Sequence, residues 1–153
     1  MSEKSRGLLK VGAALVALVA LVGLALSWLT QPTVGPAPVA WDREACGFCR
    51  MHIGDRHFAA QLRQEVGEPV NFDDPGCLFL YLDKEQPKVV ELYFRHESQD
   101  RWLDRREVVF RLDVAQTPMG FGLAATTSDV ASQAQALASA RAWLRERQEK
   151  DKP

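Results

Sequence analysis

The chain has 153 residues, 46% of them hydrophobic and 25% charged, and its formal net charge is −1. This length provides one small domain, and mixed charges of this kind exclude the strongly basic surface of a nucleic-acid binder. Three of the 19 basic and one of the 20 acidic residues precede residue 31, which leaves a net charge of −3 beyond it. Three cysteines, an odd number, argue against a disulfide framework and leave at least one thiol for another role.

The N-terminus combines a short basic segment, residues 1–10, with an uncharged apolar stretch, residues 11–29. As a helix these 19 residues reach about 28 Å, close to the hydrocarbon thickness of about 30 Å. Lys4, Arg6 and Lys10 precede the stretch, which places the N-terminus in the cytoplasm. We predict an uncleaved, single-pass signal anchor in the inner membrane, with a cleaved signal peptide as the alternative.

The segment after the anchor has little to bury. Residues 30–40 hold three prolines and one glycine, and we predict an extended tether. The folded domain is expected over residues 41–149, with a short tail at residues 150–153. The domain would then lie in the periplasm, or be exported if the N-terminal segment is cleaved.

The first part of the domain predicts two strands followed by a helix. "HFAAQLR" (57–63) alternates apolar and polar residues as a strand does, and "VNF" (70–72) resumes an extended segment after a turn. Asp74 is a favourable N-cap and Pro75 suits the first helical position, so a helix begins there. Pro87 ends it.

A second round of strands and a helix follows. Strands are predicted over "KVVELYFRH" (88–96), "REVVFRLD" (106–113) and "GFGLAATT" (120–127). Ser128 is the expected N-cap of an amphipathic terminal helix over residues 130–148. The order of elements predicts an α+β fold of two ββα-like halves.

The segment "CGFCRMHIGDRH" carries the potential chemistry of the chain. A c-type haem site requires histidine directly after the second cysteine, but Arg50 stands there. Cys46, Cys49, His52 and His57 contain the ligand types of a zinc finger. Only two residues separate Cys49 from His52, however, whereas a finger needs about a dozen to fold the chain back.

A thiol-disulfide exchange site is a further alternative. Cys46 and Cys49 have the spacing of the thioredoxin-like dithiol, and Thr117 with Pro118 resembles the Thr-Pro pair of that fold. In that fold, however, a strand precedes the dithiol and a long helix follows it and lowers the thiol pKa. Here the motif directly follows the tether, and Gly54 interrupts any helix soon after it.

A copper site accounts for more of the residues. Apart from the initiator, the chain has two methionines, Met51 beside Cys49 and Met119 in "TPMGFG". Thiolate and thioether sulfurs are soft donors that select Cu(I). His52 is a further candidate ligand beside them. Cys77 lies in an apolar helical segment and is expected to be a buried small hydrophobic residue.

Four segments together resemble the NosL family, the copper-carrying accessory proteins for nitrous oxide reductase. They are "CGFCRM", "VNFDDPGCLFLYL", "LYFRHESQDRWLDRREVVF" and "TPMGFGLAATTSDVA", in the order and spacing of that family. The resemblance runs from Glu44 to Ala140. Its most specific parts are the Cys-x-x-Cys-x-Met start, the Phe-Asp-Asp segment and the Thr-Pro-Met-Gly-x-Gly loop.

The resemblance implies a non-enzymatic chaperone that binds one Cu(I) per monomer and delivers it to apo nitrous oxide reductase. By position, Cys49, Met51 and Met119 match the copper ligands of the family, and Cys46 matches an accessory cysteine. The implied partners are the apo-enzyme, the cytoplasmic membrane and other copper-assembly proteins. A periplasmic thiol-disulfide oxidoreductase and an assembly factor that does not use metal remain as alternatives.

Two further positions extend this comparison with the family. Asp73 and Asp74 match its acidic pair, and we interpret them as a helix cap and a support for the ligands, because hard carboxylates suit Cu(I) poorly. Members commonly have glycine where this chain has Arg50. The sequence therefore predicts that a tight glycine turn is not available at this position.

Overall fold

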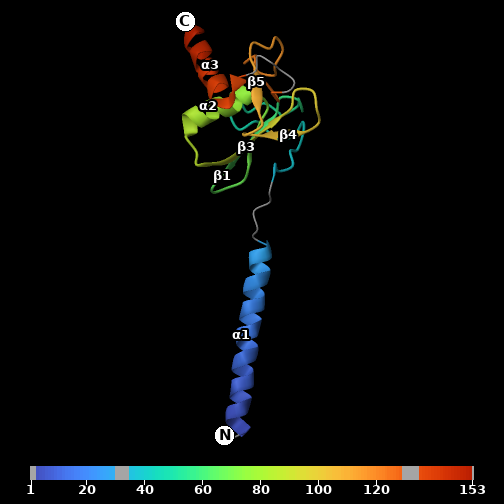
Figure 1. Cartoon of the computed structure of the whole chain (residues 1–153), viewed down its shortest axis with the longest axis vertical. Coiled ribbons are helices and arrows are strands. Elements are labelled where there is room, and N and C mark those ends of the chain that lie inside the picture. Colours follow the sequence, from blue (N-terminus) through green and yellow to red (C-terminus); the bar gives the residue numbers. More distant parts are fainter. Residues whose placement is uncertain (1–2, 30–34, 129–134, 153) are drawn as a thin grey trace. The chain divides into compact units, whose positions relative to one another are not determined.

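The computed structural model describes residues 3–29, 35–128 and 135–152, in two compact units, Met1–Gly35 and Pro36–Pro153 (Figure 1). In the second unit, hydrogen bonds to the folded domain begin before Trp41, the first residue of the predicted domain. The backbone N–H of Ala37 donates to Oε1 of Gln61 at 2.7 Å, and Nε2 of Gln61 donates back to the Ala37 carbonyl at 3.1 Å. The last residues of the predicted tether are therefore attached to the domain.

The first unit contains α1, which runs over Glu3–Leu29. Within the ranges described above, no helix combines the length and the apolar character needed to cross a membrane. The membrane anchor over residues 11–29 stays a prediction from the sequence.

The described part of the second unit has two antiparallel sheets and two helices (Figure 1). The sheet ordered β2-β1-β3-β4 contains β1 (Ala60–Gln64), β2 (Val70–Phe72), β3 (Val89–Arg95) and β4 (Trp102–Asp104). The sheet ordered β6-β5-β7 contains β5 (Val109–Arg111), β6 (Ala124–Thr126) and β7 (Gln135–Ala136). The helices are α2 (Pro75–Glu85) and α3 (Leu137–Lys150). The predicted α+β class is confirmed.

The strands do not separate into one sheet per half. β3 comes from the second round of elements, yet it pairs along β1 from the first, with Leu62 opposite Leu92. β4, which the sequence did not predict, then extends this sheet beyond β3. Strand pairing is a tertiary choice, and the alternation pattern of a single strand does not reveal its neighbours.

The terminal helix begins later than predicted. Ala136 is its N-cap, and residues 135 and 136 pair with β5 instead of continuing the helix toward Ser128. Gln135 lies opposite Phe110, so these residues are held extended by the second sheet. Ser128 lies in a turn, and residues 129–134, where the predicted helix started, lie outside the described residues.

The core joins α2 to both sheets through three buried phenylalanines, one from each element. Phe79 of α2 lies with its ring centroid 5.9 Å from that of Phe94 in β3 and 5.4 Å from that of Phe110 in β5. The rings of Phe94 and Phe110 meet edge to face at 5.0 Å. Such aromatic pairs add about 0.5–1.5 kcal/mol beyond the burial of their area. α2 is thereby fixed between the two sheets.

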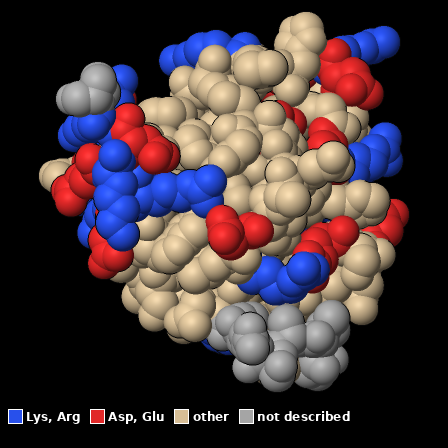
Figure 2. Space-filling view, turned by 90° about the horizontal axis from the view of Figure 1, so that it is seen from above, with Lys and Arg blue, Asp and Glu red and all other residues tan. Residues whose placement is uncertain are grey.

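An ion-pair cluster holds α2 against α3. Asp83 of α2 accepts from Nε of Arg141 at 2.8 Å and from Nε of Arg145 at 2.7 Å, both on α3. The bond to two guanidinium groups holds the pKa of Asp83 well below its usual range. Seen from above, acidic and basic side chains lie beside one another in mixed groups, and some of them reach the middle of the view (Figure 2).

Candidate metal site

The Cys-x-x-Cys-x-Met segment forms a tight hairpin. The N–H of Cys46 donates to the Met51 carbonyl at 2.8 Å, and the N–H of Arg50 donates to the Cys46 carbonyl at 3.2 Å. One residue pair further from the turn, the N–H of Ile53 donates to the Glu44 carbonyl at 3.0 Å. Both cysteines of the motif therefore lie in the turn of a hairpin, and neither opens a helix.

The turn corrects the expectation about Arg50. This residue adopts φ +67°, the left-handed conformation that glycine enters most easily. A non-glycine residue in this region is strained by roughly 1–2 kcal/mol. The tight turn is therefore present without glycine, because the hairpin hydrogen bonds around it hold Arg50 in this conformation.

A buried polar network attaches the hairpin to the first sheet. The N–H of Gly47 donates to the Asn71 carbonyl at 2.8 Å, and Nδ2 of Asn71 donates to Oε1 of Glu44 at 2.6 Å. Gln61, which binds Ala37, donates from Nε2 to Oδ1 of Asn71 at 2.6 Å. A Cβ at position 47 would lie 2.4 Å from Cγ1 of Val70, so only glycine allows this close approach.

The start of α2 forms the opposite wall of the site. As predicted, Asp74 is the N-cap, and its Oδ1 accepts from the N–H of Gly76 at 2.7 Å. Its Oδ2 accepts from the N–H of Met119 at 3.3 Å. Burial raises the pKa of Asp74 to about 6. One carboxyl group therefore caps the helix and attaches the Thr-Pro-Met-Gly loop to it.

Close packing reinforces this attachment. A Cβ on Gly76 would lie 2.4–2.7 Å from three side-chain atoms of Phe121, the residue that follows Gly120 in the loop. Such distances are far inside van der Waals contact, so the loop and the helix meet this closely only at glycine. Cys77, the next residue along α2, is completely buried behind this contact.

Three cysteine sulfurs meet between the hairpin and α2. The Sγ atoms of Cys46, Cys49 and Cys77 all lie within 4.8 Å of one another. Cys46 and Cys77 are fully buried, whereas Cys49 is half-buried. Cys77 was expected to be a buried hydrophobic residue; it is buried as expected, but in a cluster of thiols. The odd number of cysteines was the sequence signal that could have pointed to it.

The electrostatics of the cluster favour one thiolate among the three sulfurs. The sulfur of Cys46 accepts a hydrogen bond from the thiol of Cys77, and this is the main reason why the pKa of Cys46 is lowered. Hydrogen bonds from the backbone N–H groups of Asp73, Phe48 and Cys49 lower it further. The same interaction and burial raise the pKa of Cys77, and burial raises that of Cys49. A metal ion bound by all three sulfurs would release the protons of the other two.

The other predicted site residues have different environments. Met51 is 55% exposed, and Met119 is half-buried and packs against the core. His52 is exposed, and its backbone pairs with Ala45. Oδ1 of Asp73 accepts from the N–H of Gly54 at 3.1 Å. The roles of these residues at a metal remain predictions.

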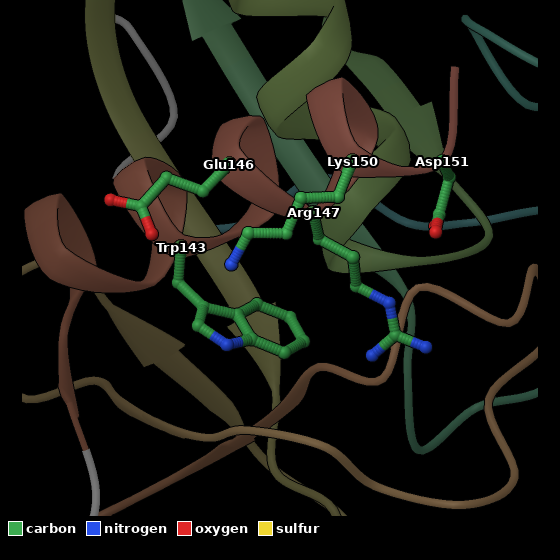
Figure 3. A pocket seen from close by; sticks show the side chains of 5 residues that line it. All are labelled: Trp143, Glu146, Arg147, Lys150 and Asp151. Carbon is green, nitrogen blue, oxygen red and sulfur yellow. The ribbon is translucent and has the colours of Figure 1, made fainter. Parts of the chain in front are cut away.

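A separate hollow of about 160 Å³ lies along the end of α3, lined by Trp143, Glu146, Arg147, Lys150 and Asp151 (Figure 3). The guanidinium group of Arg147 lies 5.3 Å from the ring centroid of Trp143, and Nη1 binds Oδ1 of Asp113 at 3.1 Å. A Cβ on Gly122 would lie 3.2 Å from Nη1 of Arg147. Arg147 thus contacts the chain at Gly122, just after the Met119 loop. The residues that line the hollow carry no sulfur.

Fold and cluster together define a small α+β domain with a candidate metal site of three cysteines. No family model matches the chain, and no curated protein matches it in sequence. Among solved structures, the chain is similar to the copper chaperone NosL from Shewanella denitrificans. The TM-score is 0.51 at 20% sequence identity, and the match covers 72% of this chain and 87% of that one. This likeness shows a NosL-like fold.

Proposed function

We propose that this protein is a Cu(I) chaperone, which binds one Cu(I) at the cysteine cluster and passes it on by ligand exchange without substrate turnover. The observation that carries the proposal is the meeting of three sulfurs within 4.8 Å of one another. Their position in a fold shared with a copper chaperone supports it.

The donor set favours Cu(I) over zinc. Thiolates are soft ligands that suit both ions, but a structural zinc site requires four ligands in a tetrahedron. Among the described residues, this cluster of cysteine, histidine and acidic ligand atoms has three members. Three sulfurs are sufficient for Cu(I), which accepts low coordination numbers, and an ion held in this way is easier to transfer.

Cys49 is common to the observed cluster and to the ligand set that the resemblance implies. The predicted set combines Cys49 with Met51 and Met119, and the cluster combines it with Cys46 and Cys77. The loop that carries Met119 is attached through Asp74 to the helix that carries Cys77. We therefore propose that the cysteines hold the ion and that the methionines assist at the margin of the site.

The proposed target rests on the sequence resemblance, and the proposed location rests on the apolar stretch at residues 11–29 and the basic residues before it. We propose delivery to apo nitrous oxide reductase, from a domain held at the periplasmic face of the inner membrane by residues 11–29. Cell fractionation, with protease added to spheroplasts, tests the location. Loss of copper from nitrous oxide reductase in cells that lack this chain, restored by the wild-type chain, tests the target. Equal restoration by a Cys49→Ser variant would favour the metal-independent assembly factor.

Copper binding itself is tested by an anaerobic competition titration of the full, reduced chain with a chromogenic Cu(I) chelator. We expect one Cu(I) per chain and a loss of affinity of at least about 100-fold for Cys77→Ser, more than the typical effect of removing a residue beside a ligand. His57→Gln, an exposed change on the same segment, serves as the control. Wild-type affinity in Cys77→Ser would contradict the three-sulfur site.

A thiol-disulfide oxidoreductase remains the second candidate, because the pKa of Cys46 is lowered and Cys49 lies close to it. Against it, Cys46 is completely buried and the motif forms a hairpin turn. Disulfide-exchange activity toward a model disulfide substrate, dependent on both residues, would support this alternative. Tight Cu(I) binding without such activity would remove it.

A further inference from the structure

The three cysteines of the cluster differ in their access to solvent. Cys46 and Cys77 are completely buried, whereas Cys49 is half-buried. A second molecule that exchanges thiols with the cluster therefore meets the sulfur of Cys49 first. The Sγ atoms of all three cysteines lie within 4.8 Å of one another, so a buried sulfur is near enough to react with whatever becomes bonded to Cys49.

The closeness that favours a metal ion also favours a disulfide. A disulfide requires two sulfurs to approach to about 2.05 Å, and a turn held by backbone hydrogen bonds needs only a local movement for this. In the periplasm, where the proposed function places the domain, protein disulfides oxidise accessible dithiols. An oxidised cluster lacks the thiolates that hold Cu(I), because the thiolate is the form of cysteine that binds metal.

Hydrogen bonds favour Cys46 as the partner of Cys49 in such a disulfide. The sulfur of Cys46 accepts hydrogen bonds from the thiol of Cys77 and from the backbone N–H groups of Asp73, Phe48 and Cys49. These donors stabilise a thiolate, which is the form of cysteine that attacks a neighbouring sulfur. The same donors stabilise Cys46 as the leaving group when the disulfide is reduced. Cys77 supplies one of the donors and stays a thiol.

We propose that the chain receives copper only after a dithiol reductant has opened a disulfide between Cys46 and Cys49. This inference rests on the proposed function, and it places a thiol-disulfide exchange directly before copper loading. The partner that it implies is a protein with two reactive thiols, which acts on this chain as its substrate. In the oxidoreductase alternative, by contrast, Cys46 and Cys49 would act on other proteins.

The reduction consists of two exchanges, and the dithiol supplies both electrons. A thiolate of the reductant attacks Sγ of Cys49, a bond forms between these two sulfurs, and Cys46 leaves as a thiolate. The second thiol of the reductant then attacks the reductant sulfur that is bonded to Cys49. This frees Cys49 and leaves the reductant as a disulfide. One proton of the dithiol goes to Cys49 and the other goes to water.

Mass spectrometry of the full chain identifies the disulfide. Cleavage by trypsin places Cys46 and Cys49 in one peptide, residues 44–50, and Cys77 in another, residues 64–84. After oxidation with glutathione disulfide and alkylation of the free thiols, we expect an internal disulfide in the first peptide and an alkylated thiol in the second. Cys49→Ser keeps only the two buried thiols, which should oxidise at least about tenfold more slowly than the wild-type pair.

Copper binding before and after reduction tests the order of events. In the anaerobic chelator titration, the oxidised chain should bind Cu(I) at least about 100-fold more weakly than the reduced chain, because two of three thiolate donors are lost. Reduced thioredoxin, used as the dithiol, should restore full affinity. Ascorbate, which keeps copper as Cu(I) but does not reduce disulfides, is the control and should restore none. A thioredoxin variant without its second active-site cysteine should be trapped on Cys49.

Three results would overturn the inference. A disulfide that includes Cys77, or three free thiols after oxidation, would contradict the assigned pair. Equal Cu(I) affinity in the oxidised and reduced chains would show that loading needs no reduction, and the proposed function would stand without it. If the reduced chain bound no Cu(I), the proposed function itself would fail, and a reduction before loading would have no role.

Discussion

The two walls of the cysteine cluster are built in different ways. At the start of α2, residues 73–79 are all buried, and Gly76 lies against Phe121 at a distance that excludes any side chain. In the hairpin, backbone hydrogen bonds hold the turn, Arg50 has a strained φ, and Met51 is largely exposed. One wall is fixed mainly by packing and the other mainly by hydrogen bonds.

Because of this difference, we expect the start of α2 to be rigid and the hairpin to open more easily. A packed interior resists displacement because its side chains have no free volume to enter. A surface hairpin opens at a smaller free energy, because fewer apolar contacts are lost. Under the proposed function, the protein must both retain its ion and release it, and the two walls would place these requirements on different segments of the chain.

The largest effect is expected from a methyl group at the packed wall. Gly76→Ala places Cβ 2.4–2.7 Å from three atoms of Phe121, one of them its Cβ, which cannot move without the backbone. Gly47→Ala, on the hairpin wall, meets the mobile end of Val70 instead. From the typical cost of overpacking, we expect Gly76→Ala to lose about 3 kcal/mol of unfolding free energy and Gly47→Ala about 1 kcal/mol.

Urea unfolding of both variants measures this difference directly. Equal losses in the two variants would mean that the walls do not differ in rigidity. A loss confined to Gly47→Ala would reverse their order.

A smaller effect is expected from the carboxyl group that joins α2 to the Met119 loop. Asp74→Ala leaves the N–H groups of Gly76 and Met119 without their partner, and we expect a loss of about 2 kcal/mol. Asp74→Asn keeps an acceptor for the cap and should lose less, since it also removes the unfavourable burial of a charge. Similar stabilities for the Ala and Asn variants would show that the carboxyl group contributes no cap.

The outer side of α2 should respond to acid. Two arginines lower the pKa of Asp83 from 3.8 to about 2, so its stabilising effect is complete above about pH 4 and disappears as the pH falls through 2. Because this side chain is partly exposed and one of its two arginine partners is 54% exposed, we expect only about 1 kcal/mol. The difference in unfolding free energy between wild type and Asp83→Asn should therefore shrink between pH 5 and pH 2. A difference independent of pH would exclude the ion pair as its cause.

The smallest effect is expected at the strained turn of the hairpin. Arg50→Gly relieves the left-handed strain at φ +67° but adds freedom to the unfolded chain, for a net gain of about 0.5–1 kcal/mol. Gln86→Gly, at the left-handed C-cap at the far end of α2, makes the same change away from both walls and should gain a similar amount. Thermal unfolding compares the two, and a loss of stability in Arg50→Gly would show that its side chain holds the turn.

Local signals in the sequence predicted the local features correctly. The cap of α2 at Asp74 and its first residue, Pro75, are present, because both depend only on the conformational and hydrogen-bonding preferences of neighbouring residues. The strand at residues 70–72 is present for the same reason. The terminal helix was predicted too long, because pairing of residues 135 and 136 with β5 overrides their helical periodicity.

The sequence by itself determined the α+β class, the start of α2 and the two segments, around Cys49 and Met119, that carry soft sulfur donors. Only the tertiary structure decided that Cys77 joins Cys46 and Cys49, since the hydrogen bond from Gly47 to Asn71 holds the hairpin against β2, the strand that leads into α2. It also decided the left-handed turn at Arg50, because the surrounding hydrogen bonds outweigh the preference of a single residue.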